Sequence, residues 1–217
     1  MLGNKTRSDS QELWDQFFLL SLFQCSDEPL DNLKIQKIIF ISEDKARREK
    51  LAAAHFPFFR YNLGPYSKVV ANDVRRLEDL GFIEPETKRP TKRGQFVLAY
   101  LDEFAQASKE ASQALSILGG VCKSYRDFRS SQLVDAVYGM EVSVIGLNGE
   151  IMRVRDIPLC TDILDPNREH LKDFSALPDD VVEDLKTEFS LTSDALDPAN
   201  PSNIDLARAI LTKALSI

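Results

Sequence analysis

The segment from residue 10 to residue 24 constrains the fold most, because apolar side chains surround most of its helical circumference. Its large apolar positions are Leu13, Trp14, Phe17, Phe18, Leu20, Leu22 and Phe23. Their spacing predicts a helix that begins after a Ser10 N-cap and is buried on most sides. The run from Phe17 to Phe23 is far shorter than the roughly 20 residues that span a bilayer. We therefore expect the central helix of a globular fold and no membrane partner.

Helical and extended patterns alternate from residue 31 to residue 120. A helix over 33–52 is expected to start at Asp31 or Asn32, and the aromatic-rich segment 55–66 should be extended and end in a turn at Gly64-Pro65. Ser67 caps a predicted helix through Leu80, which Gly81 ends. A short strand at 82–84, a basic turn at 85–93 and one long helix from Gly94 to Leu118 complete this part.

The remainder of the chain predicts a different and more acidic part. Ser130 or Ser131 should cap a short helix over 133–138, and Asn148-Gly149 predicts a type I′ hairpin between strands at 141–147 and 150–155. Two further helices are expected, one opening at Pro178 and one after Asn203. The predicted fold class is therefore mainly α (α+β), with a helical, winged-helix-like domain over 1–120. An acidic extension of helices and a hairpin over 121–217 is expected to pack on it.

The order of elements from Ser67 to Phe104 is typical of a winged helix-turn-helix, in which a recognition helix leads into a strand, a basic wing and a further helix. This interpretation predicts a surface that binds DNA or a partner through eight side chains: Lys68, Asn72, Arg75 and Arg76 on the helix, and Lys88, Arg89, Lys92 and Arg93 on the wing. Asp79 lies on the same helical face, where it would oppose phosphate binding. Use of the fold as a scaffold or protein-docking module therefore stays open beside DNA binding.

Charge is divided unevenly along the chain, whose formal net charge is −7. Residues 31–100 hold fourteen Lys and Arg against nine Asp and Glu, whereas residues 101–217 hold eleven against twenty. So acidic a protein does not coat DNA non-specifically, which leaves local contacts through the basic segment. The acidic part suits a basic partner surface.

Four stretches resemble the Panacea family of SocA-like antitoxins: LKIQKIIF at 33–40, FRYNLGPYS at 59–67, the helix end at 74–83, and the helix at 130–138. The family pattern assigns Gln36, Lys37, Gly64 and Pro65 to the fold motif. The resemblance implies a small bacterial or phage-borne regulator that binds a toxin and neutralises it, in some cases by presenting it for proteolysis. Some such proteins also bind their own promoter.

Residues that would indicate an enzyme are sparse. The chain has two histidines, and His55, between an Ala-rich segment and aromatics, is expected to be structural. Nucleotide-binding, hydrolase and metalloprotease motifs are missing from the sequence. The acidic group Asp162, Asp165, Glu169 and Asp173 is interrupted by Pro166 and predicts a solvated loop rather than a metal site. We expect no catalytic residue, no metal and no cofactor.

Cysteine usage and the N-terminal sequence bear on the compartment. The three cysteines are odd in number and lack CxxC spacing, which argues against a disulfide framework and favours a reducing environment. The first nine residues lack an apolar segment, which predicts no secretory signal and a cytoplasmic protein.

Two functions follow from these patterns. The favoured hypothesis is an antitoxin-like regulator that binds a protein partner, and the alternative is a winged-helix transcriptional regulator that binds DNA. The aromatic residues at 56–66 allow two interpretations. The favoured one is that they fill the core, and the other is that they form a stacking platform for single-stranded nucleic acid beside Arg60. A homodimer is compatible with either function.

Overall fold

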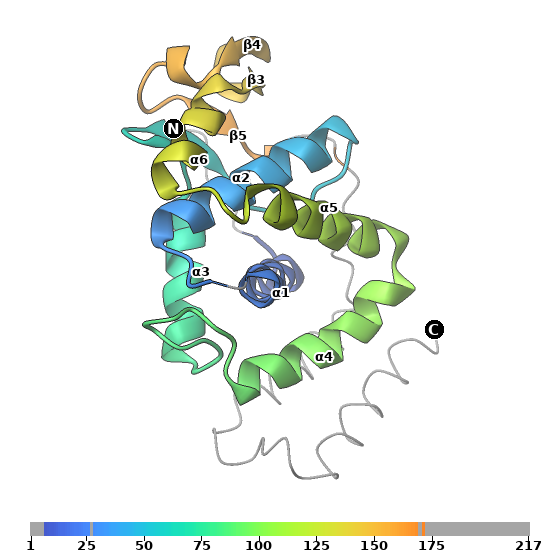
Figure 1. Ribbon diagram of the computed structural model, residues 1–217. Helices are drawn as coiled ribbons and strands as arrows, with labels where there is room; N and C mark the ends of the chain where they lie inside the picture. Colours follow the sequence, from blue (N-terminus) through green and yellow to red (C-terminus); the bar gives the residue numbers. More distant parts are fainter. Residues whose placement is uncertain (1–6, 27, 169–170, 172–217) are drawn as a thin grey trace.

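The helix α1 (Asp9–Cys25) lies at the centre of the fold, as its apolar circumference requires. In the computed structural model, which describes residues 7–26, 28–168 and 171, every residue from Trp14 to Phe23 is buried. Figure 1 shows α1 end-on, with α3 (Lys68–Asp79), α4 (Lys92–Ala107) and α5 (Lys109–Tyr125) around it, and all three contact it. The prediction of a helix buried on most sides is confirmed.

The other described elements form a small β layer and the helices beside it, in a mixed α+β fold. Two further helices are α2 (Asn32–Arg48), which packs on α5, and α6 (Ser130–Gly139), which packs on α2. The strands are β1 (Phe58–Tyr61), β2 (Gly64–Tyr66), β3 (Glu141–Val144), β4 (Glu150–Arg153) and β5 (Asp162–Leu164). Short 3₁₀ turns occupy Ile145–Leu147, Val154–Asp156 and Pro166–Arg168.

The β layer consists of two antiparallel sheets. The first has the order β2-β1-β5, with Phe59 opposite Tyr66 and Tyr61 opposite Gly64. The second pairs β3 with β4, with Val144 opposite Glu150. Because β5 pairs with β1 across about a hundred residues of chain, the C-terminal part shares both a sheet and one hydrophobic core with the N-terminal part. The predicted division at residue 120 falls inside α5.

Helix boundaries differ from the sequence prediction at two places. Ser8, not Ser10, caps α1: its hydroxyl accepts a hydrogen bond from the Gln11 backbone at 3.2 Å, and the Gln11 side chain accepts one from the Ser8 backbone at 3.0 Å. The helix predicted over 33–52 begins after the predicted cap Asp31 but ends at Arg48. The chain reverses there with Lys50 at φ +58°, which brings Leu51 into the core.

The single long helix predicted from Gly94 to Leu118 is two helices. Ser108 has φ −105° and ψ 122°, which interrupts the helical path, and its hydroxyl accepts a hydrogen bond from Ala111 N at 3.2 Å. Ser108 is thus the N-cap of α5. Gly119 and Gly120, predicted to end the helix, lie inside α5.

Some turns and strands also differ from the sequence prediction. The predicted turn residues Gly64 and Pro65 belong to β2, and the turn is Asn62-Leu63. The β3–β4 hairpin exists, but Asn148-Gly149 is only the end of a longer loop that contains the turn Ile145–Leu147, with Asn148 at φ 57°. The predicted strand at 82–84 is reduced to a bridge between Ile83 and Pro90. The helices predicted from Pro178 and Asn203 lie outside the described residues.

Candidate binding surfaces

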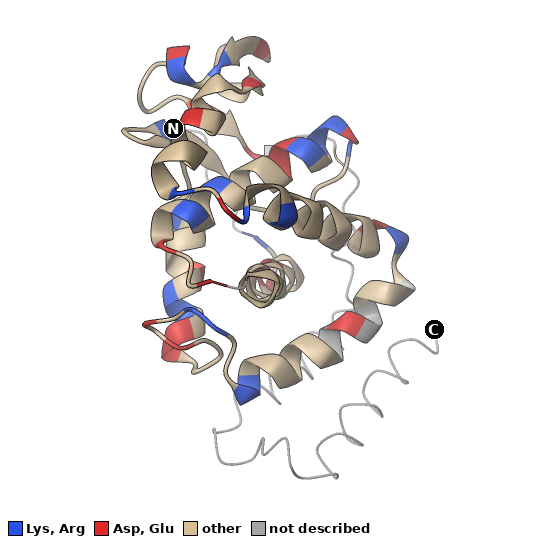
Figure 2. Ribbon diagram, viewed as in Figure 1, with Lys and Arg blue, Asp and Glu red and all other residues tan. Residues whose placement is uncertain are grey.

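The outer face of α3 presents Lys68, Asn72 and Arg75 to solvent, at intervals of four and three residues. The opposite face is buried through Val70, Val74 and Leu77, as the helical period requires. These three exposed side chains make no hydrogen bond or ion pair with the described part of the chain. Figure 2 shows both signs of charge along α3, because Asp79 and Glu78 follow near its end. The predicted cationic side chains are therefore exposed on this face, but acidic side chains lie beside them.

Three other predicted contact residues are engaged inside the molecule. Arg76 forms an ion pair with Glu12 of α1, and Lys88 forms one with Glu78. The Arg93 guanidinium donates to the Leu80 carbonyl oxygen at 2.7 Å and lies over the Phe82 ring at 4.7 Å. Arg76 thus joins α3 to α1, while Lys88 and Arg93 hold the segment between α3 and α4 in place, so a phosphate would have to displace existing contacts.

The segment between α3 and α4 forms a small ladder in the place where a wing is expected. The Glu84 backbone N–H donates to the Arg89 carbonyl at 2.9 Å, and the Thr91 N–H donates to the Phe82 carbonyl at 3.0 Å. Arg89 and Lys92 are exposed at its base. Gly94 is required here, because a Cβ at this position would lie 2.1 Å from the Phe82 carbonyl oxygen.

Gln36 joins α2 to the start of α3. Its side-chain amide donates to the Ser67 carbonyl at 2.9 Å and accepts from the Ser67 N–H at 2.8 Å. Ser67 is fully buried, so these two bonds satisfy backbone groups that water does not reach. Gln36, predicted from its place in the motif, thus fixes the junction between the β1–β2 hairpin and α3.

Lys37 lies beneath the same hairpin and is only 3% exposed. Its ammonium donates to the Pro65 carbonyl at 2.7 Å, and its Cε would lie 3.6 Å from a Cβ on Gly64. Burial, together with the positive charge of Arg60, lowers the pKa of Lys37 to about 8. The four motif residues Gln36, Lys37, Gly64 and Pro65 therefore meet in one place, where they position the hairpin.

Arg60 and Tyr138 hold the other side of the hairpin. The Arg60 guanidinium lies 5.0 Å from the centre of the Tyr138 ring, and its Nε donates to the Val154 carbonyl at 3.1 Å. The Tyr138 hydroxyl donates to the Asn62 carbonyl in the turn at 2.7 Å. The hairpin is therefore fixed by α2 on one side and by α6 on the other.

The alternation of β1 divides the aromatic residues between two faces, which answers the question that the sequence left open. Phe56 and Phe58 are buried in the core. Phe59, Tyr61 and Tyr66 form a three-ring cluster on the other face, with ring centroids 5.6 to 6.0 Å apart. Core packing is thus confirmed for the first pair, whereas the three-ring cluster is partly exposed.

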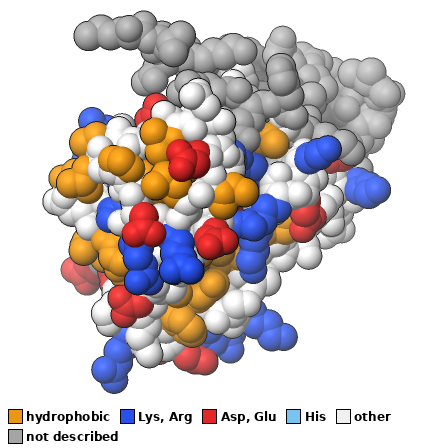
Figure 3. All heavy atoms as spheres, turned by 90° about the horizontal axis from the view of Figure 1, so that it is seen from above, with side chains coloured by type: hydrophobic (Ala, Val, Ile, Leu, Met, Phe, Trp, Pro, Cys, Tyr) orange, Lys and Arg blue, Asp and Glu red, His pale blue; other side chains and the backbone are white. Residues whose placement is uncertain are grey.

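Several large apolar side chains of the β layer and its loops are exposed. Within the described residues they are Tyr61, Leu63, Ile151 and Leu159, from β1, its turn, β4 and the loop before β5. The loop that carries Leu159 is tied to β1, because the Cys160 N–H donates to the Arg60 carbonyl at 2.8 Å. Figure 3, which looks down on this end of the molecule, shows apolar side chains interspersed with charges of both signs. We call Tyr61, Leu63 and Leu159, with Phe59 and Tyr66 beside them, the hairpin surface.

A buried group of charges links α1 to the rest of the core. Asp15 is fully buried and accepts from the His55 backbone N–H at 2.8 Å and from Arg7 at 2.6 Å, and the His55 ring nitrogen lies 3.0 Å from it. Arg7 also binds Asp73 at 2.7 Å. Burial, with the nearby Asp15 charge, raises the pKa of Glu43 well above its usual range. His55 is 1% exposed and meets Asp15 through both its backbone N–H and its ring.

The acidic cluster predicted near residue 165 is only partly visible, because Glu169 and Asp173 lie outside the described residues. Among those described, no three His, Cys, Asp or Glu side chains are placed to hold a metal ion. None of the described helices combines the length and apolar character needed to cross a bilayer.

Comparison with known proteins gives no relative. No protein-family model, curated protein or solved structure shows significant similarity to the chain.

The sequence did not identify the hairpin surface as a binding surface. The alternation from Phe56 to Tyr61 nevertheless already separates the rings that point inward from those that point outward.

Proposed function

We propose that the chain is a non-enzymatic, antitoxin-like regulator of the Panacea kind, with a winged-helix-like core, that binds a protein partner and neutralises it or presents it for proteolysis. One observation carries this proposal: among the side chains that the structure describes, the exposed large apolar ones, Tyr61, Leu63, Ile151 and Leu159, lie on β1, β4 and the loops beside the strands. An exposed apolar patch beside polar groups is typical of a protein-binding surface.

The rigid support of the hairpin surface favours the same function. Gln36 and Lys37 hold the hairpin from α2, and Tyr138 holds its turn from α6. A surface that is ordered before binding loses less conformational entropy when a partner docks. Tyrosine is also among the residues that contribute most to binding energy at interfaces.

DNA binding is the second candidate, and the exposed side chains of Lys68, Asn72, Arg75 and Lys92 favour it. They make no hydrogen bond or ion pair with the described residues, so they are available to phosphates or base edges. Against it stand Asp79 on the same face, the internal ion pairs of Arg76 and Lys88, and the acidic net charge. Phosphate binding would use only part of the predicted surface.

The two functions are separated by capture of the tagged full-length chain from its native host at low salt. Mass spectrometry identifies captured protein, and the absorbance ratio at 260 and 280 nm detects nucleic acid. The proposal expects one stoichiometric protein whose toxicity on expression is relieved by this chain. Sequence-enriched DNA without a protein partner would contradict it and support the transcriptional regulator.

A further inference from the structure

Two strand edges of the β layer are closed by side chains from α2. The outer edge of a strand carries backbone N–H and carbonyl groups that can pair with another strand. In β2, Pro65 has no N–H, and its carbonyl accepts from the buried Lys37 ammonium at 2.7 Å. At the outer edge of β3, the Arg47 guanidinium donates to the Ser143 carbonyl at 2.7 Å. These contacts occupy carbonyl groups that an added strand would need.

Within the described residues, the outer edge of β4 is unpaired. In an antiparallel pair, alternate residues bond to the partner strand, and the residues between them point their N–H and carbonyl groups outward. The Val154 N–H donates to the Met140 carbonyl at 2.9 Å, so by alternation Met152 also bonds to β3. Ile151 and Arg153 therefore turn their backbone groups away from β3, and these groups make no hydrogen bond with other described residues.

The side chains along this edge are exposed and ordered by charge. Figure 1 shows β4 at the outer end of the β layer. Ile151 is 71% exposed, and the exposed Glu150 side chain makes no hydrogen bond or ion pair with a described residue. The Arg153 Nε lies 3.7 Å from the Glu141 carboxylate, farther than a direct hydrogen bond allows. The edge thus presents an acidic, an apolar and a basic side chain beside unpaired backbone groups.

We propose that the outer edge of β4 binds an extended segment of a partner protein, which joins the β3–β4 sheet as a further antiparallel strand. Side chains directly opposite each other on neighbouring strands interact. The segment therefore carries a basic residue opposite Glu150, an apolar residue opposite Ile151 and an acidic residue opposite Arg153. The proposal does not depend on the function proposed above, because it uses neither the hairpin surface nor α3.

A second copy of this chain matches the edge less well than a different protein. Opposite side chains lie on the same face of a sheet, and successive side chains of a strand lie on opposite faces. Two identical antiparallel strands related by a twofold axis therefore place opposite each other only residues whose numbers differ by an even amount. Glu150 and Arg153 differ by an odd amount, so such a dimer leaves both charges without an opposite charge across the strands.

The test uses the isotope-labelled, full-length protein and NMR, with the synthetic peptide Thr-Glu-Thr-Ile-Lys-Thr as the probe. In the antiparallel orientation its Glu lies opposite Arg153, its Ile opposite Ile151 and its Lys opposite Glu150. In the free protein, the amides of Ile151 and Arg153 should exchange hydrogen faster than that of Met152. Both should exchange about tenfold more slowly at a peptide concentration about ten times the dissociation constant.

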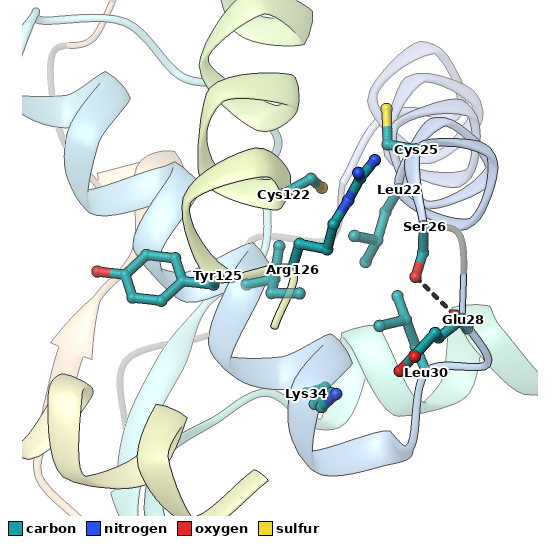
Figure 4. Close-up of a pocket in the computed structure, with 10 residues that line it drawn as sticks. Leu22, Cys25, Ser26, Glu28, Leu30, Lys34, Cys122, Tyr125 and Arg126 are labelled. Atoms are coloured by element: carbon teal, nitrogen blue, oxygen red, sulfur yellow. Dashed lines mark hydrogen bonds between the residues drawn. The ribbon is translucent and has the colours of Figure 1, made fainter. Parts of the chain in front are cut away.

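Controls separate strand addition with matched charges from unspecific binding. The peptide Thr-Lys-Thr-Ile-Glu-Thr has the same composition with the two charges exchanged, and it should bind about tenfold more weakly. Glu150→Lys should weaken binding of the first peptide about fivefold, and Thr-Glu-Thr-Ile-Glu-Thr should restore it. Glu28→Lys should bind like the wild type, because Glu28 is exposed and lines a pocket between α1, α2 and α5 that no strand residue lines (Figure 4).

Three results would overturn the proposal. The first is equal binding of the two peptides of exchanged charge, and the second is unchanged exchange at Ile151 and Arg153 with the first peptide. The third is slow exchange of both amides in the free protein. Protection that rises with protein concentration would identify a second copy on the edge, whereas protection independent of concentration would identify another part of the same chain.

Discussion

Two surfaces meet at Ser67, the outer face of α3 and the hairpin surface, and they use their side chains in opposite ways. Of the cations predicted on and after α3, Arg76, Lys88 and Arg93 contact other parts of the same chain. The hairpin is held from behind by Gln36 and Lys37, while its outer side chains Tyr61 and Leu63 are about half exposed, at 49% and 54%. A cationic residue in the sequence can therefore indicate an ion pair within the chain as readily as a binding site. Exposed apolar side chains on a rigid support, by contrast, favour a binding partner.

The largest effect on stability is expected when Gln36→Ala removes the support of the hairpin. The change leaves the N–H and carbonyl of buried Ser67 without partners, so the free energy of unfolding should fall by about 2–5 kcal/mol. Urea unfolding measures it. The control Gln106→Ala removes only an exposed bond to Asp102 and should cost under about 0.5 kcal/mol. Equal small losses in both variants would show that the junction does not depend on Gln36.

Lys37 predicts a pH dependence for the same support. Its pKa is about 8 in the folded state and 10.5 when unperturbed, so the unfolded chain binds more protons between these values. The wild type should therefore gain up to about 3 kcal/mol of stability relative to Lys37→Met as the pH rises from 8 to 10.5, and it should lose this gain as the pH returns from 10.5 to 8. Chemical unfolding of both proteins across this range gives the difference, with Lys68→Met as an exposed control. If the difference in unfolding free energy between the two proteins does not change with pH, the pKa of Lys37 is not lowered by folding.

Gly64 tests the shape of the hairpin rather than its anchoring. Its φ of +94° is a conformation that a β-branched residue adopts only with strain, so Gly64→Val should destabilise the fold by about 1–3 kcal/mol. Thermal and urea unfolding report the loss. The control Gly119→Ala, in helical backbone with open space around it, should instead stabilise by about 0.5–1 kcal/mol. An unchanged melting temperature for Gly64→Val would refute the positive φ.

The α3 surface should show the smallest effect on stability. Arg75 and Lys92 are exposed and form no hydrogen bond or ion pair with the described residues, so the double variant Arg75→Glu with Lys92→Glu should change the free energy of unfolding by less than about 0.5 kcal/mol. Its binding to a protein partner should also be retained. Loss of partner binding with an intact fold would identify this face as the docking surface.

Local patterns in the sequence predicted the local structure well. The burial of α1 and the Ser67 cap follow from apolar spacing and capping residues, which act over a few positions. Gln36 was indicated only by the resemblance to the family motif, and the turn predicted at Gly64-Pro65 lies instead at Asn62-Leu63. The break at Ser108 was missed because the apolar pattern continues through it, although a serine N-cap was there to be found.

Contacts between distant segments were beyond the same reasoning. The pairing of β5 with β1 and the ion pair of Arg76 with Glu12 join residues with no shared periodicity. Lys68, Arg75 and Arg76 lie on the exterior of α3, as the helical period predicts, yet the partner of Arg76 could not be inferred from spacing. The hairpin surface needed the strand register before its outward side chains could be told from the core.

The central claim is that the hairpin surface, not the α3 face, binds a protein partner, and one binding measurement tests it most directly. The affinity of the captured partner is compared for Leu63→Asp, for Arg75→Glu with Lys92→Glu, and for Ala99→Asp, an exposed control on α4. A hot spot of about 2 kcal/mol or more predicts at least a roughly thirtyfold loss for Leu63→Asp and about wild-type affinity for the other two. Wild-type affinity in Leu63→Asp with loss in the α3 variant would contradict the account.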